Sequence, residues 1–321
     1  MKLDTLAIAV ALSLGAHAAS HAETYPDKPV KMLVGFAAGG STDLVTRVLT
    51  QHMSEALGQS IVVENRLGAS GTVATDVLAK STPDGYTLGA CSTSAFTILP
   101  YLMKSVRYDP IKDFQPVAQV GLAPYILVAS PQLKVKSVQD VVDLARTKKG
   151  GLTYASGGVG SASQMAGELF SASAGVKMVH VPYKGLAQAI ADVIEGRVDI
   201  AFDQEASAGE NIRAQRLHAV AIANDKRSPT LPDVPTFSES GMPLSAAQWI
   251  GVCGPAGMPR DRVAKLYDSV RDAVGDGKVA ARFQQLGVQP ALLDPAAFGK
   301  AIDADRAKWK KLIDDAGITL E

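Results

Sequence analysis

The sequence predicts an α/β fold of two α/β domains joined by two crossover segments. Three observations predict this fold. Apolar segments typical of strands alternate with amphipathic helices, which indicates βαβ units and a mostly parallel sheet. The alternation restarts near residue 135, which indicates a second unit. The 321 residues suffice for two domains that each bury a core of their own.

The first unit alternates strand, helix and strand. Apolar residues recur at helical spacing from Leu44 to Leu57, and Gly58 follows as a typical helix terminator. A turn at 83–85 precedes the next strand-like segment. We therefore expect strands at residues 30–36, 61–64 and 86–90 and a helix at residues 44–57.

The second unit is a complete α/β pattern, followed by a proline-rich return segment at 229–243 and a strand at 249–253. We expect strands at 152–155, 179–183, 198–202 and 217–223, and helices from residue 137, through 165–170, at 188–194 and at 210–213. The C-terminus is predicted to be helical, with one apolar face formed by Phe298, Ile302, Trp309, Leu312 and Ile313. We expect these last helices to pack on the first domain.

With that packing, the chain crosses between the domains twice, near residues 120–129 and 243–249. Two crossings form a hinge. The predicted division is residues 23–124 with 247–321 as domain 1 and residues 125–246 as domain 2. Because ligands of open α/β sheets bind beyond the carboxyl ends of the strands, the cleft between the domains is the expected site.

Two turns rich in glycine and serine, at residues 35–43 and 156–164, each follow a strand and open a helix. The first N–H groups of a helix lack partners and lie at the positive end of its dipole, so each turn offers a cradle for an anion. Neither turn contains Lys, Arg or His, which favours a carboxylate that is later released. Helix capping competes with binding at 161–164, but the neighbouring glycines permit close approach and favour binding. The predicted ligand-binding residues are Phe36, Ala38, Gly40, Ser41, Asp43, Ser92, Thr93, Ser94, Ser156, Gly160, Ser161, Ser163, Gln164, Tyr183 and Asp203.

Several of these residues have a structural alternative. Asp43 in the first helical turn stabilises the dipole whether or not it touches a ligand. Asp203 would repel a carboxylate, so ordering of water or of the hinge is favoured over direct contact. The polar residues 92–94 serve equally well as caps. Tyr183 is expected to line the pocket and Lys184 to be a solvated surface charge.

The N-terminus predicts export. Lys2 precedes the apolar run 6–14, and residues 20–22 form a small-x-Ala cleavage site, so residues 1–22 are predicted to be a signal peptide. An uncleaved anchor is the alternative, which the short apolar run disfavours.

Composition excludes several function classes. The 32 Lys and Arg residues balance 32 Asp and Glu residues, so no nucleic-acid or anionic-membrane partner is expected. The first turn nearly matches a P-loop but has Ser41 at the lysine position, and the second lacks the third glycine of a dinucleotide-binding loop. Scattered histidines and the absence of CxxC and G-x-S-x-G motifs predict no metal, no cofactor and no enzyme. For Cys91 and Cys253, buried free thiols are favoured over a disulfide.

Motifs along the whole mature chain carry a family resemblance. They are YPDKPV (25–30), GGSTD (39–43), VVENR (62–66), PDGYTL (83–88), VHVPYKG (179–185), VD (198–199), FD (202–203), KRSP (226–229) and LPDVPT (231–236). In these the chain resembles the extracytoplasmic solute receptors of the tripartite tricarboxylate transporter system, the Bug family. The resemblance implies a type II periplasmic binding-protein fold, a Venus-flytrap cleft, and periplasmic delivery of a di-, tri- or aromatic carboxylate to membrane permease subunits.

The chain departs from the family within the turns. Family members usually carry prolines at the positions of Gly35, Ala37 and Ala38, often a histidine at Gln164, and a small residue at Leu186. Leu186 and Phe96, where they face the cleft, favour a bulkier or aromatic acid. Two other functions remain open from the sequence: a periplasmic carboxylate sensor and an exported hydrolase.

Overall fold

The computed structural model describes residues 25–316 and 318, so the predicted signal peptide lies outside the described residues. Ten strands form one continuous sheet. The strands are β1 (Val30–Val34), β2 (Ile61–Asn65), β3 (Thr87–Ser92), β4 (Phe114–Ala129), β5 (Leu152–Ser156), β6 (Met178–Pro182), β7 (Ile200–Gln204), β8 (His218–Ile222), β9 (Ala247–Pro255) and β10 (Gln289–Leu293).

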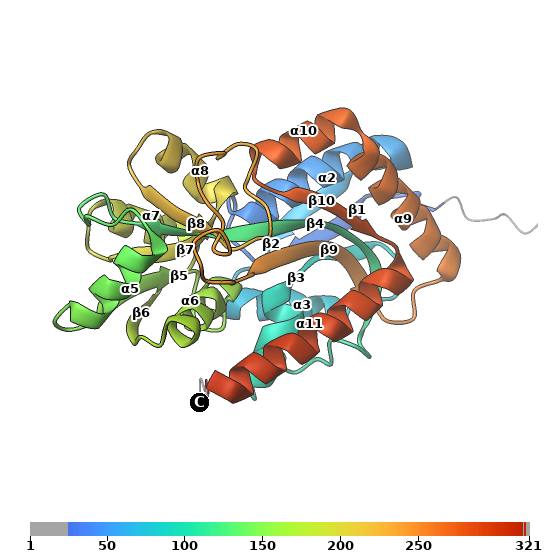
Figure 1. Ribbon diagram of the computed structural model, residues 1–321. Helices are drawn as coiled ribbons and strands as arrows, with labels where there is room; N and C mark the ends of the chain where they lie inside the picture. Colours follow the sequence, from blue (N-terminus) through green and yellow to red (C-terminus); the bar gives the residue numbers. More distant parts are fainter. Residues whose placement is uncertain (1–24, 317, 319–321) are drawn as a thin grey trace, which may run out of the picture.

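Helices cover both faces of this sheet (Figure 1). They are α2 (Ser41–Leu57), α3 (Thr72–Ala79), α4 (Leu99–Leu102), α5 (Val138–Thr147), α6 (Ala162–Ala174), α7 (Leu186–Ile194), α8 (Glu205–Arg213), α9 (Arg260–Gly275), α10 (Gly277–Gln285) and α11 (Pro295–Ala316), with short helical turns η1 (Ala69–Gly71) and η2 (Ser94–Ile98). In α2, Val45, Leu49, Met53 and Leu57 at helical spacing are buried, and Gly58 ends the helix in the left-handed conformation, as predicted.

The sheet has two halves that share one long strand. The main strand order is β2-β1-β3-β9-β4-β7-β5-β6, with β10 and β8 also paired to β4. Residues 114–124 of β4 pair with β9, and residues 125–129 pair with β7. We call β1, β2, β3, β9, β10 and residues 114–124 the first half of the sheet, and β5 to β8 with residues 125–129 the second half.

The prediction of a mostly parallel sheet is wrong for the centre of the molecule. The outer pairs are parallel, as the βαβ pattern requires: β1 with β2 and β3, and β5 with β6 and β7. The central pairs of β4 with β7 and β9, and of β3 with β9, are antiparallel. The reason is that β4 and β9 carry the chain between the halves in opposite directions, and Figure 1 shows them side by side.

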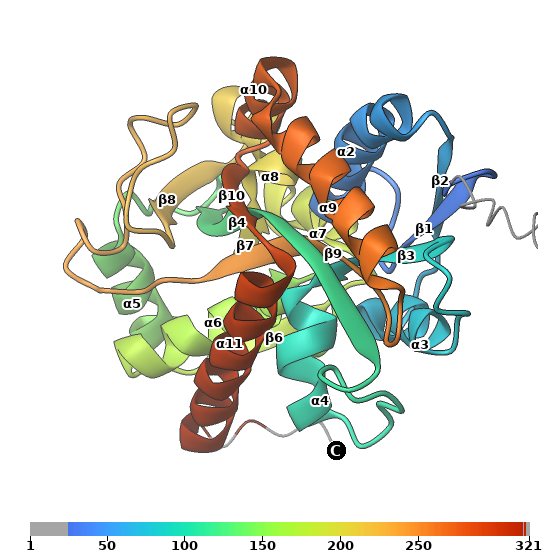
Figure 2. The same ribbon diagram turned by 90° about the vertical axis from the view of Figure 1, so that its right-hand side faces the viewer.

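Each half buries its own apolar cluster. Met32, Leu49 and Ile250 belong to one cluster of the first half, and Tyr154, Phe170 and Phe202 belong to one of the second. The last helix joins the two: α11 packs along β4 (Figure 2), yet Trp309 and Ile313 near its end enter the cluster of the second half. The C-terminal helix therefore packs on the first half, as expected, and its end also packs on the second.

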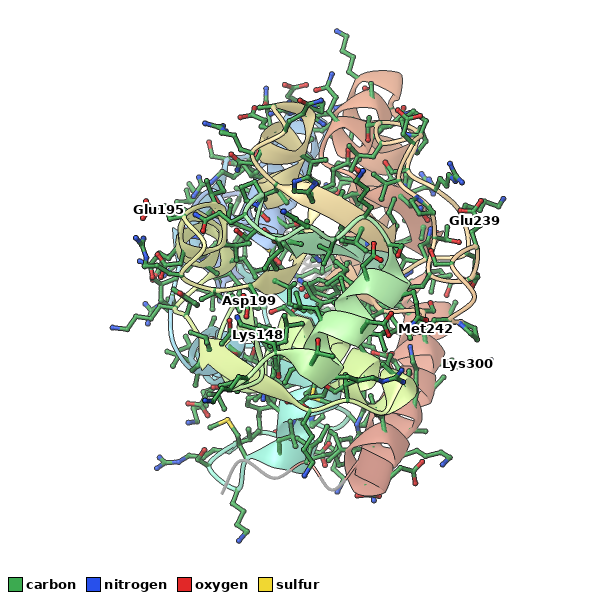
Figure 3. All side chains as sticks on the ribbon, turned by 60° about the vertical axis from the view of Figure 1, so that its left-hand side comes forward. Lys148, Glu195, Asp199, Glu239, Met242 and Lys300 are labelled. Atoms are coloured by element: carbon green, nitrogen blue, oxygen red, sulfur yellow. The ribbon has the colours of Figure 1, made fainter. Side chains whose placement is uncertain are left out.

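An ion pair between a buried carboxylate and a partly exposed lysine fixes the second half near the start of β7. Asp199 is 6% exposed and accepts hydrogen bonds from Lys148 Nζ on both carboxylate oxygens, at 2.6 and 2.5 Å. The backbone N–H and hydroxyl of Thr153 donate to the same carboxylate, each at 2.8 Å. Figure 3 labels Lys148 and Asp199 beside each other. This network ties α5, β5 and β7 together.

Cys91 and Cys253 are buried free thiols on the adjacent strands β3 and β9. Their register is diagonal, because Cys91 lies opposite Gly251 and Cys253 opposite Gly89. Within residues 25–316 and 318, no helix combines the length and the apolar character needed to cross a membrane.

Candidate functional site

The two predicted turns face one another across a pocket of about 90 Å³, which we call the cleft pocket. Its walls come from the first turn, η2, the crossing strands, the second turn, and the starts of α7 and α8. The lining residues are Phe36, Ala37, Ala38, Gly40, Ser41, Thr42, Ser94, Tyr125, Gly157, Ser161, Ala162, Ser163, Lys184, Gly185, Leu186, Ala187, Gln204, Ser207 and Gln248.

The first turn presents hydrogen-bond donors without protein partners. It leads into α2, whose N-cap is Gly40 and whose first turn has no side-chain cap. Among the described residues, no acceptor is paired with the N–H of Ser41 or Thr42, as expected at a helix start. The hydroxyl of Ser41 is also buried and unpartnered within the described chain. This end of the pocket is therefore suited to an anion.

The second turn is already largely satisfied by its own side chains. Ser161 caps α6 by accepting from the N–H of Gln164, at 3.2 Å, and the Gln164 side chain accepts from the N–H of Gly160, at 2.7 Å. Ser163 Oγ accepts from the N–H of Gly157 and shares a hydrogen bond with Ser161 Oγ, both at 2.9 Å. Two hydroxyls share one bond, so one hydroxyl proton of this pair remains for a ligand. The two turns are thus chemically unequal.

The crossing strands form the back of the pocket and are linked to the first turn. Tyr125 of β4 donates its hydroxyl to Gln248 Oε1 at 3.1 Å, and Gln248 Nε2 donates to Thr42 Oγ1 at 2.8 Å. Thr42 Oγ1 is thus an acceptor in this chain, and its own proton is available to the pocket. On the second half, Gln204 Nε2 donates to the carbonyl of Ala123 at 3.1 Å.

Besides the bonds at the crossing strands, two further hydrogen bonds connect the halves at this site. Ala162 N–H, the first of α6, donates to Ser94 Oγ at 3.0 Å. Ser70 Oγ donates to the carbonyl of Val159, at the tip of the second turn, at 2.9 Å. Ser70 has a left-handed backbone, with φ of 50°, in a tight loop at residues 68–71. The halves are therefore in contact at the small pocket and at the tip of the second turn, as in a closed cleft.

Charged groups are few in the cleft pocket. Lys184, at its mouth and exposed, is the single ionisable Lys, Arg, His, Asp or Glu side chain in the lining. Behind the first turn, burial raises the pKa of Asp43, but hydrogen bonds from Arg47, Asn65 and the Gly39 N–H outweigh this effect. Together they hold the pKa of Asp43 below its usual range. Behind the second half, burial raises the pKa of Asp203 to about 6.

The structure brings about half of the predicted residues to the pocket. Those that line it are Phe36, Ala38, Gly40, Ser41, Ser94, Ser161 and Ser163. Those that do not line it are Asp43, Ser92, Thr93, Ser156, Gly160, Gln164, Tyr183 and Asp203. Most of the second group support the site instead.

Burial explains why Ser92 does not reach the pocket, and specific contacts explain the same for three others. Ser92 ends β3 and is buried. Thr93 Oγ1 accepts from the N–H of Trp249 at 3.1 Å, and the Tyr183 hydroxyl donates to Asp192 at 2.5 Å. Ser156, fully buried, contacts His180 Nε2 at 2.6 Å.

Phe96 does not face the cleft, so it cannot favour a bulkier acid. Its ring is 1% exposed and packs on Phe114 and Trp249, with ring centroids 4.8 and 6.0 Å apart. Leu186 does line the pocket. Only one of the two bulky side chains is therefore positioned to select ligand shape.

Sequence reasoning missed Thr42, Tyr125, Gln204, Ser207 and Gln248. Tyr125 and Gln248 lie where β4 and β9 cross between the halves, so the predicted crossings could have found them. Ser207 was hidden because α8 begins at Glu205 and not at residue 210. Because α8 begins directly after β7, Ser207 lies in the first turn of the helix. Serines follow the strands in the two predicted turns in a similar way.

A larger cavity, of about 440 Å³, lies elsewhere and lacks the chemistry of the cleft pocket. Pro124 and Ile126 of β4 line it, and since side chains alternate along a strand it lies on the other face from Tyr125. Its walls are mostly apolar, and its one carboxylate, Glu205, is buried and accepts from Ser228 at 2.7 Å. A carboxylate ligand would meet a like charge here, so we place the candidate site in the smaller pocket.

Comparisons with known proteins bear on the family and the fold. The family model described as "Tripartite tricarboxylate transporter family receptor" matches residues 45–318. The periplasmic binding protein BugD is 33% identical, with a TM-score of 0.86 over 92% of this chain and 99% of that one. R. palustris Rpa4515, solved with adipate, is 32% identical, with a TM-score of 0.88 over 92% and 99%. MatC from Rhodopseudomonas palustris, solved with malate, is 33% identical, with a TM-score of 0.83 over 90% and 100%. These similarities confirm the predicted periplasmic binding-protein fold.

Proposed function

Since the chain belongs to the receptor family of the tripartite tricarboxylate transporters, we propose that it captures an organic carboxylate in the cleft pocket and delivers it to a transporter permease. Its relatives are periplasmic solute-binding proteins, and this chain is a solute receptor of the same kind. One observation carries the ligand class: the uncapped start of α2, where donors of the Ser41 region have no protein partner among the described residues.

Hydrogen-bond accounting supports a carboxylate at the first turn. Buried donors that lack partners are costly, at about 1–3 kcal/mol each, and an anion at a helix start relieves that cost. The helix dipole adds about 0.3–1 kcal/mol. The solved relatives hold adipate and malate, which are dicarboxylates of four to six carbons. We infer a ligand of that class here.

Closure of the cleft is the proposed mechanism. Residues 23–124 with 247–321 and residues 125–246 act as two domains that hinge at β4 and β9. The ligand binds the first turn, and contacts with the second half that form only on closure stabilise the closed state. The closed, loaded form then docks on the permease. Export to the periplasm by the segment 1–22 belongs to the same proposal.

Catalysis is not part of the proposal, although a serine and a histidine are in contact. Ser156 Oγ and His180 Nε2 are 2.6 Å apart, as in a nucleophile and its base. Ser156 is fully buried, is absent from the pocket lining, and also hydrogen-bonds the backbone of Gly158. A substrate in the pocket would not reach it. The contact is better explained as support for the second turn.

Binding is tested with the mature protein and a panel of C4–C6 mono- and dicarboxylates, by isothermal titration calorimetry. Thr42→Val keeps the shape but removes the hydroxyl that links the pocket to Gln248, and we expect affinity to fall about 10- to 100-fold. Thr50→Val is the matched control, because Thr50 lies in the same helix and its hydroxyl donates to the Arg47 carbonyl, away from the pocket. Absence of binding by every acid, or equal loss in both variants, would refute the proposal.

The transport role needs a separate experiment, because a sensor would bind the same ligand. Uptake of the labelled acid is measured in a strain with the gene deleted and in one complemented with Thr42→Val. We expect uptake to be lost in the first and reduced in the second. Normal uptake together with an altered transcriptional response to the acid would favour the sensor.

A further inference from the structure

The wall of the cleft pocket formed by α8 presents an acceptor instead of a donor. Ser207, in the first turn of α8, lines the pocket and is half-buried. Its hydroxyl donates to Asp203 Oδ1 at 2.5 Å, with the Gln204 carbonyl at 3.2 Å as a second acceptor. A serine hydroxyl has one proton and two lone pairs. With the proton held inward, Ser207 offers only lone pairs to a ligand.

The carboxylate of Asp203 keeps that proton in place. Asp203 is 0% exposed at the end of β7, and its Oδ1 also accepts from the N–H of Gln204 at 2.7 Å. Its Oδ2 is buried with no partner among the described residues. Among the described residues, no ion pair involves this carboxylate. It is held by two hydrogen bonds, one from the N–H of Gln204 and one from the hydroxyl of Ser207.

The opposite wall has the reverse polarity. The hydroxyl of Ser41, the proton of Thr42 Oγ1 and the first N–H groups of α2 are all donors. A ligand that fits both walls carries a carboxylate at one end and a hydrogen-bond donor that reaches α8. An unsubstituted dicarboxylate would place an acceptor against the lone pairs of Ser207.

We propose that Ser207, held by Asp203, selects organic acids that carry a hydroxyl or ammonium group, and discriminates against the unsubstituted acids of the same length. The inference rests on the proposed function and deepens it. Ser207 contacts the ligand, and Asp203 is a positioning residue that acts through it. A hydroxyl and an ammonium group can both donate a hydrogen bond to Ser207. Ligands that differ in this one group distinguish the two.

The selection depends on the charge of Asp203. Burial raises the pKa of Asp203 to about 6, so the carboxylate is ionised at pH 7.5 and holds the Ser207 proton. Below pH 6 the Asp203 carboxyl is protonated and no longer holds the hydroxyl proton of Ser207 by its charge. Ser207 can then donate that proton to a ligand carboxylate. The other titratable groups nearby are Tyr125 of β4, Glu205 of α8 and Lys184 at the pocket mouth. Burial raises the pKa of Tyr125, and Glu205 accepts a hydrogen bond from Ser228.

The test compares acids that differ by one group: malate, aspartate and succinate, and 2-hydroxyadipate and adipate. Dissociation constants are measured at pH 7.5 for the wild type, Ser207→Ala and Asp203→Asn. We expect the wild type to bind either the hydroxyl or the ammonium form at least about tenfold more tightly than the unsubstituted acid. In each variant, the ratio of the two dissociation constants should come close to one. Ser240→Ala is the control, because the Ser240 hydroxyl donates to the Thr236 carbonyl in a turn away from the pocket.

The outcomes separate the two proposals. Equal binding of substituted and unsubstituted acids by the wild type, or an unchanged ratio in Ser207→Ala, would overturn this inference while leaving carboxylate capture intact. Absence of binding by all five acids would overturn both. In the wild type the ratio should also fall between pH 7.5 and pH 5.5, after correction for protonation of the ligand, and in Asp203→Asn it should not change. A parallel fall in that variant would show that Asp203 does not position Ser207.

Discussion

Removal of the Ser70 hydroxyl tests whether contacts across the cleft set the closing equilibrium. Ser70 Oγ donates to the Val159 carbonyl at 2.9 Å, and Ser70 does not line the pocket. Ser70→Ala therefore changes affinity only through closure. One exposed hydrogen bond contributes about 0.5–1.5 kcal/mol, so the closing constant should fall by about 2- to 12-fold. A ligand that binds only the closed form should lose affinity by up to the same factor.

Two measurements make this prediction refutable. Calorimetry gives the dissociation constant, and energy transfer between dyes on α5 and α9 gives the closed fraction without ligand. If the free protein is mostly open, the dissociation constant rises, and if it is mostly closed, its small open fraction rises by the same factor as the closing constant falls. Thr72→Ala is the control, because Thr72 bonds within the same loop, to the Ala69 carbonyl at 3.0 Å. Wild-type values for both quantities in Ser70→Ala would refute the reasoning.

Three further predictions concern stability. Asp199→Ala strands the partly exposed Lys148 and should lower the free energy of unfolding by about 2–4 kcal/mol in urea titration; a loss below 1 kcal/mol would contradict the role of this network. Because burial raises the pKa of Asp203 to about 6, above its unfolded value, the folded protein binds the extra proton between about pH 4 and 6. The free energy of unfolding of the wild type should therefore fall by about 2 kcal/mol relative to Asp203→Asn as the pH rises from 4 to 7, and parallel curves would refute this. Gly167→Ala places a methyl group 2.4 Å from the buried Tyr154 ring and should lower the free energy of unfolding by about 1–3 kcal/mol, although alanine favours helices; an unchanged melting temperature would show that the ring yields freely.

Local sequence patterns predicted the outer parts of the fold and not its centre. The βαβ rhythm identified β1 with α2 and β5 with α6, because each is a short-range pattern of apolar spacing and turn residues. The long strand β4 was expected only as a crossing segment. Its pairing with β9 joins residues more than 120 positions apart, which no local pattern encodes.

The candidate site shows the same division. The first and second turns were found because glycine, serine and a helix start are adjacent in sequence. What these residues bond to was not predictable: Ser94 Oγ meets the N–H of Ala162, and Thr42 meets Gln248. Such contacts depend on how the two halves of the sheet come together. They decide which donors remain for a ligand.

The first turn and the contact across the cleft are mechanically connected through a glycine. A Cβ on Gly35 would lie 2.6 Å from the Cα of Gly71, so only glycine lets the first turn lie this close to the loop at 68–71. That loop carries Ser70, which holds Val159 of the second turn. In the proposed mode of binding, a ligand carboxylate at the first turn lies close to the loop that carries this bond. We expect a ligand that orders the first turn also to order the loop that meets the other half, because packed backbone transmits displacement. Closure and ligand binding would then be coupled through packing as well as through the ligand itself.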